Sequence, residues 1–170
     1  MLSMSFIRSC VQRSGAVIAL VLLLLGCSTM NSRVGGVLNL DTDLALTLQA
    51  ASELNLDERD RSSPLFLRFY QLKSDTLFNK TAFIDLYEND TQALGSEFIA
   101  KQELEPLKPG ELREEKIVLE KDTQFVAIFG EFYRYKDAKY KVIIPVTKNN
   151  IVKNKLNVRI FKNKIDLLDQ

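Results

Sequence analysis

The chain of 170 residues contains no histidine, no tryptophan and only two cysteines. Without histidine there is no Ser-His-Asp triad, no Cys-His pair and no imidazole ligand for a metal. Neither a Gly-rich phosphate loop nor an Asp-rich calcium loop is present. The 23 basic residues nearly balance the 22 acidic ones, so the charge does not suggest a nucleic-acid partner. These absences exclude most familiar catalytic and metal-binding chemistry.

The first 27 residues have the pattern of a secretory signal. Arg8 and Arg13 precede an uncharged apolar run, residues 16–25, which ends at Gly26 and Cys27. A basic start, a short apolar segment and a small residue before the cut are typical of signal peptides. The run is shorter than the roughly 20 apolar residues that a membrane-spanning helix needs. We therefore predict that residues 1–26 are removed by cleavage between Gly26 and Cys27.

The end of this segment, Leu24-Leu25-Gly26-Cys27, resembles the lipobox of bacterial lipoproteins. The resemblance implies diacylglycerol on the Cys27 thiol and an N-acyl chain on its new amino group, and no other cofactor is expected. Two acyl chains already give stable membrane anchoring. Ser28, in place of the aspartate that retains enterobacterial lipoproteins at the inner membrane, implies the periplasmic face of the outer membrane. The alternative is a soluble secreted protein in which the cysteine is a coincidence.

The mature chain is predicted to contain a tether and one domain. Residues 27–40 hold the lipidated cysteine and a polar stretch with Gly35-Gly36, although residues 37–40 could instead begin the first strand. Residues 41–170 are enough for one domain with one hydrophobic core. Cys10 leaves with the signal and Cys27 carries lipid, so this domain must be held by packing without a disulfide.

The pattern of the domain is mainly β. Leu44, Leu46, Leu48 and Ala50 alternate with other residues, as in a half-buried strand. Apolar segments follow at intervals of about 8–12 residues, which predicts an antiparallel β-sandwich of about 7–8 strands. We expect strands at 65–72, 98–104, 113–119, 125–132, 140–147 and 156–167. The most apolar, 65–72 and 125–132, should be central, and Pro145 should mark an edge or a bulge.

A short helical insertion is predicted after the second strand. Ser74 or Asp75 could cap a helix in which Phe78, Ala82 and Leu86 share one face, and residues 90–95 resemble a further capped turn. Its aromatic side chains are better explained by packing on the sheet than by the alternative, a ligand-binding aromatic box.

The polar segment 52–63 is longer than a tight hairpin needs and ends at Pro64. Two interpretations are open: a solvated connector, or a loop that binds a partner, since long loops on rigid scaffolds often carry function.

A resemblance to a known family rests on several of these segments. They are residues 64–73 (Pro-Leu-Phe-Leu-Arg-Phe-Tyr-Gln-Leu-Lys), Phe78, 82–83, 86–87, the turns at 94–95 and 109–110, and the late apolar strand that leads to Tyr133. Together they resemble the type VI secretion outer-membrane lipoproteins, the TssJ family. The resemblance implies a transthyretin-like β-sandwich with an extra helical element, no enzymatic activity, and binding to the periplasmic part of the inner-membrane core protein TssM. Such binding would build the trans-envelope membrane complex.

In that family the loop between the first two strands is implicated in the contact. The matching positions here are Glu53, Leu54, Asn55, Leu56, Asp57, Glu58, Arg59, Asp60, Arg61, Ser62 and Ser63. The resemblance makes Leu54 and Leu56 candidate apolar anchors and the charges at 57–61 a rim that steers association.

Two other functions are considered. A periplasmic module that binds a small ligand or an envelope component would need convergent polar groups in an apolar pocket. An enzyme could use the carboxylate pairs Glu114-Glu115 or Glu103/Glu105. Adjacent residues on a strand point to opposite faces, however, so Glu114 and Glu115 should not converge.

Overall fold

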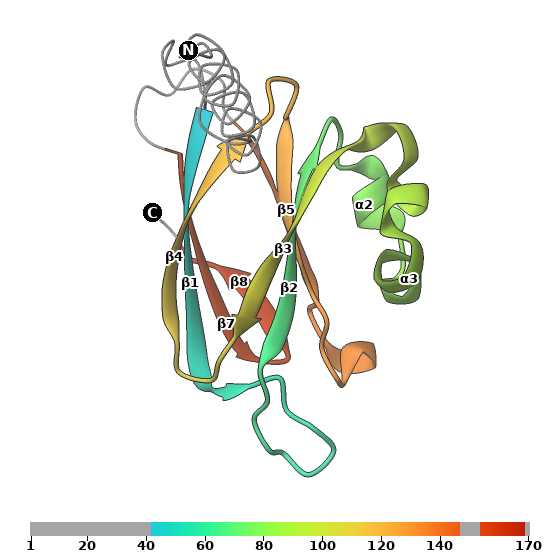
Figure 1. Ribbon diagram of the computed structural model, residues 1–170. Helices are drawn as coiled ribbons and strands as arrows, with labels where there is room; N and C mark the ends of the chain where they lie inside the picture. The colour runs from blue at the N-terminus through green and yellow to red at the C-terminus, as the bar shows by residue number, and fades with distance from the viewer. Residues whose placement is uncertain (1–41, 147–153, 169–170) are drawn as a thin grey trace, which may run out of the picture. The chain divides into compact units, whose positions relative to one another are not determined.

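Two four-stranded sheets pack face to face, and helices cover the outer face of one of them (Figure 1). The computed structural model describes residues 42–146 and 154–168, all within one compact unit, 41–170. The predictions for Gly26, Cys27 and the tether fall outside the described residues.

The first sheet has the strand order β4-β1-β7-β8 and the second has the order β3-β2-β5-β6. In the first sheet the bounds are β1 (Thr42–Leu54), β4 (Leu112–Leu119), β7 (Asn154–Lys162) and β8 (Lys164–Leu167). In the second they are β2 (Leu65–Leu72), β3 (Phe98–Leu107), β5 (Phe125–Gly130) and β6 (Lys141–Pro145). The sandwich predicted from the sequence is confirmed, with one parallel pair, β1 with β7, among otherwise antiparallel neighbours.

The alternation of apolar residues in the sequence correctly predicts which face of each strand points into the core. Leu44, Leu46 and Leu48 of β1 are buried between the sheets. On β4, Ile117 is 3% exposed while the next residue, Val118, is 54% exposed. The apolar strands β2 and β5 are the central pair of their sheet and β6, which contains Pro145, is an edge strand, as expected.

The observed strands differ from the predicted ones at two places. β1 continues to Leu54, four residues beyond the predicted end at Ala50. The predicted last strand is two strands, β7 and β8, joined by a turn at Asn163 in which Lys162 has a φ of 52°. The turn lets β8 pair antiparallel with β7 and complete the sheet.

The predicted helix is two helices, α2 (Thr76–Lys80) and α3 (Phe83–Leu94), because Thr81 and Ala82 are extended. The Lys141 ammonium donates to the carbonyls of Phe78, Asn79 and Thr81 at 2.7, 2.9 and 2.8 Å, so a strand residue caps the end of α2. α3 ends at Gly95, whose φ of 48° suits glycine. Short 3-10 turns follow at η1 (Gly95–Glu97) and η2 (Tyr135–Asp137).

A second core lies between the helices and the β2-β5 face. Its buried members are Tyr70, Leu72, Phe78, Phe83, Leu86, Leu94, Ala127 and Phe129. The Tyr70 and Phe78 ring centroids are 5.7 Å apart, and those of Phe83 and Tyr135 are 4.3 Å apart. The aromatic side chains thus fill their own space, which is the packing that the sequence favoured over a ligand box.

A buried charge cluster fastens α3 to the sheet. The Asp90 carboxylate accepts hydrogen bonds from the Arg68 guanidinium (3.1 Å), the Tyr70 hydroxyl (2.9 Å) and the Lys101 ammonium (2.9 Å). Arg68 also pairs with Glu131 at 2.6 Å. Because Asp90 is 6% exposed, its charge depends on these partners in place of water.

Because of this cluster, the free energy of unfolding depends on pH. Burial alone would raise the pKa of Asp90, but hydrogen bonds from Lys101, Tyr70 and the Thr91 backbone lower it from 3.8 to about 2. The stability that this group contributes is present above its unfolded pKa and is lost as pH falls through its folded pKa. We expect the wild-type protein to lose about 2 kcal/mol more unfolding free energy between about pH 5 and pH 1 than Asp90→Asn does. Urea unfolding at each pH measures this, and equal slopes for the two proteins would contradict it.

Candidate functional site

The loop between β1 and β2 meets two other segments at one end of the sandwich. We call these segments together the loop end: residues 55–64, the β5-β6 connection 131–140, and the β7-β8 turn at 162–163. β1 runs the length of the sheet from Thr42 to this end (Figure 1), a span of about 40 Å at roughly 3.4 Å per residue. The loop end and the start of β1 are therefore at opposite ends of the sandwich.

Asn55 joins the three segments. Its side-chain amide donates to the Pro64 carbonyl at 2.9 Å, and its side-chain oxygen accepts from the Tyr133 backbone at 2.8 Å. Its backbone N–H donates to the Lys162 carbonyl at 2.9 Å. The residue is buried, with a φ of 47° that asparagine tolerates better than most residues. Asn55 thus binds the β7-β8 turn through its backbone, and the end of the loop and the β5-β6 connection through its side chain.

We expect Asn55→Ala to destabilise the protein by about 2 kcal/mol, because two part-buried backbone groups lose their side-chain partner and alanine tolerates a φ of 47° less well than asparagine. Asn55→Gly loses the same hydrogen bonds without the backbone strain, so it should be less destabilising by about 1 kcal/mol. Urea unfolding of both variants measures the difference. Equal losses would show that backbone strain is not part of the role of Asn55.

The tip of the loop is a closed turn. The Asp57 carboxylate accepts from the backbone N–H groups of Arg59 and Arg61, at 2.8 and 3.0 Å, and from the Arg61 guanidinium at 2.8 Å. The Arg61 backbone bond, followed by the Arg61 side chain, holds the pKa of Asp57 below its ordinary value. Two of the predicted rim charges therefore form the turn itself, whereas Glu58, Arg59 and Asp60 are exposed.

The prediction that Leu54 and Leu56 are apolar anchors for a partner is wrong. Leu54 is completely buried between the sheets, and Leu56 is 8% exposed. The Leu56 backbone N–H donates to the Asn163 side chain at 3.2 Å, which holds this residue against the β7-β8 turn. Glu53 also differs from the expectation, because it lies on β1 and not in the loop.

Sequence reasoning missed the exposed aromatic residues beside the loop. Tyr133, whose backbone N–H meets Asn55, is 62% exposed, and Phe66, two residues after Pro64, is 55% exposed. Arg134 approaches the loop tip and pairs with Asp60 at 3.2 Å. These residues belong to apolar or charged runs that predict strands and turns, and no local pattern shows that they meet the loop.

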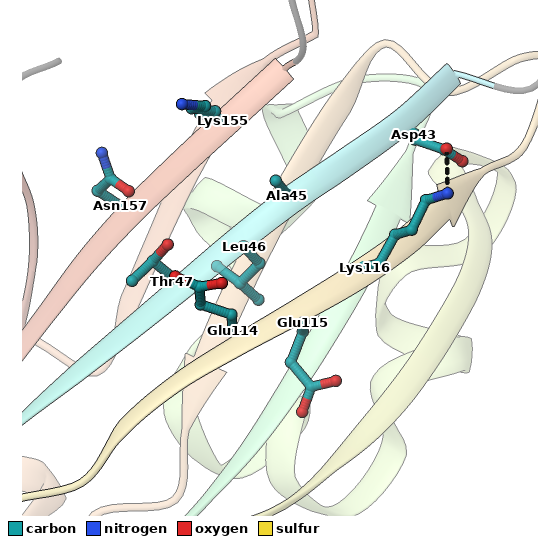
Figure 2. A pocket seen from close by; sticks show the side chains of 9 residues that line it. All are labelled: Asp43, Ala45, Leu46, Thr47, Glu114, Glu115, Lys116, Lys155 and Asn157. Atoms are coloured by element: carbon teal, nitrogen blue, oxygen red, sulfur yellow. Dashed lines mark ion pairs between the residues drawn. The ribbon is translucent and has the colours of Figure 1, made fainter.

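The outer face of the β4-β1-β7 sheet has a shallow depression (Figure 2). Ala45 and Thr47 of β1 form its floor, while Leu46 belongs to the inner core. Asp43 and Lys116 pair across one end at 2.6 Å. Small and charged side chains line it, without the apolar walls and convergent polar groups of a small-molecule site.

The carboxylate pairs do not form a catalytic arrangement. Figure 2 shows the Glu114 and Glu115 side chains pointing away from each other, as adjacent strand residues should. Glu103 lies 3.5 Å from Lys101 and is largely exposed. Within the described residues, no three or more His, Cys, Asp or Glu side chains gather to hold a metal ion. In the same residues, no helix has the length and apolarity needed to cross a membrane.

Comparison with known families gives one match. A family model described as "Type VI secretion lipoprotein, VasD, EvfM, TssJ, VC_A0113" matches residues 42–163. The match covers the sandwich from the first residue of β1 to the turn after β7. A comparison with curated proteins finds no significant match.

Solved structures share the fold. The T6SS lipoprotein TssJ1 from Pseudomonas aeruginosa is 25% identical, with a TM-score of 0.70 over 76% of this chain and 97% of that one. A chain of a structure described as "Type VI membrane complex" is 20% identical, with a TM-score of 0.66 over 75% and 98%. A chain of a structure described as the T6SS protein TssM C-terminal domain from EAEC is 18% identical, with a TM-score of 0.65 over 75% and 98%. The similarity thus covers nearly the whole of each of these chains.

Proposed function

The chain belongs to the type VI secretion lipoprotein family that includes TssJ, and we propose that it anchors the secretion complex to the outer membrane. In this proposal lipid on Cys27 holds the protein at the periplasmic face. The loop end binds the periplasmic part of the inner-membrane core protein TssM, so that the two membranes are bridged. The role is structural and not enzymatic.

The family match over residues 42–163 is the observation that carries the proposal. Two further findings support the partner: structural neighbours come from structures described as a type VI membrane complex and as a TssM C-terminal domain. The lipobox at Leu24–Cys27 supports the anchor, because a lipoprotein of this family requires an acylated cysteine.

The geometry of the sandwich is compatible with a protein that links the two membranes. In the sequence the lipidated cysteine precedes residue 42, which begins β1, whereas residues 55–64 follow the other end of that strand. A strand of about 40 Å separates residue 42 from the loop, so a partner could occupy the loop end without meeting the start of β1. Force between the two membranes would then pass along the strands of the sandwich.

The loop tip provides a test that leaves the fold intact. Replacing residues 58–60 by Gly-Ser-Gly removes the exposed charges but keeps Asp57, Arg61 and the buried Leu54 and Leu56. Glycine also suits position 60, where φ is 56°. We expect the exchange to weaken binding to TssM at least about tenfold, because contacts that reach a partner are lost from the centre of the interface. Biolayer interferometry with both full-length proteins in one detergent measures the affinity.

A second exchange serves as control for that measurement. Residues 121 and 122, in the turn between β4 and β5, are equally exposed but lie beside the start of β1. Their replacement by Gly-Ser should leave the affinity within about twofold, as surface changes outside an interface do. Equal losses for the two turns would refute the assignment of the loop, and no binding by the wild-type protein would refute the partner.

A further inference from the structure

The helices leave part of the second sheet uncovered near the loop end. On β2 the outer-facing residues Tyr70 and Leu72 are buried beneath α2 and α3. Arg68, the next outer position, donates to the carbonyls of Leu86 and Tyr87 in α3 at 3.0 and 3.1 Å. One position further, Phe66 is 55% exposed, because the helices do not extend over it.

Phe66 borders a hollow between β3 and the start of the β5-β6 connection. Its other walls are Pro106, Glu103 and Glu105 of β3, and Glu131, with Arg68 and Leu104 behind them. We call this the Phe66 hollow. It combines an exposed aromatic ring with a half-buried proline, which gives an apolar surface inside a polar rim, the usual anatomy of a binding hot spot.

The rim of the Phe66 hollow carries excess negative charge. Three glutamates of the rim, Glu103, Glu105 and Glu131, share two cations, Arg68 and Lys101, with the buried Asp90. Arg113, which donates to the backbone carbonyls of Glu105 and Pro106, is itself paired with Glu111. Among the described residues, no cation forms an ion pair with Glu105. A partner that places a lysine or arginine here would therefore gain a favourable interaction, and an acidic partner would be repelled.

The Phe66 hollow is continuous with the loop end. The Glu131 backbone N–H donates to the Phe66 carbonyl at 3.0 Å, and two residues later Tyr133 donates to Asn55. The loop itself exposes charges and no large apolar side chain, because Leu54 and Leu56 are buried. The apolar part of an interface centred on the loop must come from its neighbours.

We propose that the Phe66 hollow receives an apolar side chain of TssM that stands beside a lysine or arginine. The inference rests on the proposed function and names the chemistry of the same contact. Phe66 supplies the apolar anchor that the loop lacks, and Glu105 pairs with the basic residue. The loop tip then supplies charged contacts beside this anchor in the same interface.

Two variants with matched controls test the Phe66 hollow, using full-length proteins in detergent. Phe66→Ser should raise the Kd for TssM at least about tenfold, whereas Val118→Ser, 54% exposed on the other sheet and opposite the start of β1, should change it less than about twofold. Glu105→Lys should slow association about three- to tenfold at low salt, and the effect should shrink at high salt. Glu114→Lys, on the outer face of β4, is its control.

The outcomes separate the inference from the function on which it rests. If the loop-tip exchange weakens binding but Phe66→Ser and Glu105→Lys do not, the Phe66 hollow is not part of the interface and the proposed function stands. If the wild-type protein does not bind TssM, both the proposed function and the inference about the Phe66 hollow are refuted. If Phe66→Ser alters only self-association in sedimentation, a second copy of this chain occupies the hollow and the inference is overturned.

Discussion

Asp90→Ala is expected to lower the free energy of unfolding by about 3–5 kcal/mol. The Asp90 carboxylate accepts hydrogen bonds from four residues, Arg68, Tyr70, Lys101 and Thr91. The side chains of its two cationic partners, Arg68 and Lys101, are only 14% and 26% exposed. Without the Asp90 carboxylate, two cations lie close together with less compensating charge, and the Tyr70 hydroxyl loses its acceptor. A domain of this size is stabilised by only about 5–15 kcal/mol in total, so the loss is a large part of its stability.

Two further variants distinguish the contribution of the Asp90 cluster to stability from a general effect of substitutions in α3. Tyr70→Phe removes one donor to Asp90 and should cost about 1 kcal/mol. Glu88→Ala, exposed on the same helix beyond its first turn, should change stability by less than about 0.5 kcal/mol. Urea unfolding followed by far-ultraviolet circular dichroism gives all three values. A loss below about 1 kcal/mol for Asp90→Ala would show that the cluster does not fasten the helix to the sheet.

Cys27→Ser is expected to abolish membrane attachment while the sandwich still folds. A serine hydroxyl cannot take up diacylglycerol through a thioether, so the acyl chains that anchor the protein are absent. The sequence after Cys27 contains no cysteine and the described core packs without Cys27, so the melting temperature should be unchanged. Fractionation of the periplasm and the outer membrane, with labelled palmitate as a tracer, measures the change.

The control for this experiment is the other cysteine. Cys10 lies within the predicted signal peptide, so Cys10→Ser should leave both the label and the fractionation unchanged. The cells should lack the rest of the secretion apparatus, since a bound partner could hold unlipidated protein at the membrane. Palmitate label on the Cys27→Ser protein, or its persistence in outer membranes, would contradict the lipid anchor.

The fold was predictable where the alternation of apolar residues along a strand determines which side chains are buried. Leu44, Leu46 and Leu48 lie inward because alternate strand residues share a face. The break between α2 and α3 was not predictable, because Phe78, Ala82 and Leu86 keep helical spacing across it. There the Lys141 ammonium, 60 residues away in sequence, binds the carbonyls that a continuous helix would have used. The parallel pairing of β1 with β7 is likewise set by contacts between distant segments.

At the candidate site too, the sequence predicted some features and not others. The position of the loop between the first two strands followed from its polar composition and Pro64, but the roles of its residues did not. Leu54 has the same parity as Leu44, Leu46 and Leu48, a signal that it faces inward, and its burial agrees with that signal. Asn55 has no comparable signal, because its partners Pro64, Tyr133 and Lys162 come from three separate segments.

Photo-crosslinking in living cells tests the central claim, that the loop end meets TssM, most directly. A photoreactive amino acid at Arg59 lies at the exposed loop tip, and one at Lys121 lies at the opposite end of the sandwich, near the start of β1. The proposed arrangement predicts a crosslinked adduct with TssM from position 59 and none from position 121. An adduct from position 121 alone would contradict it.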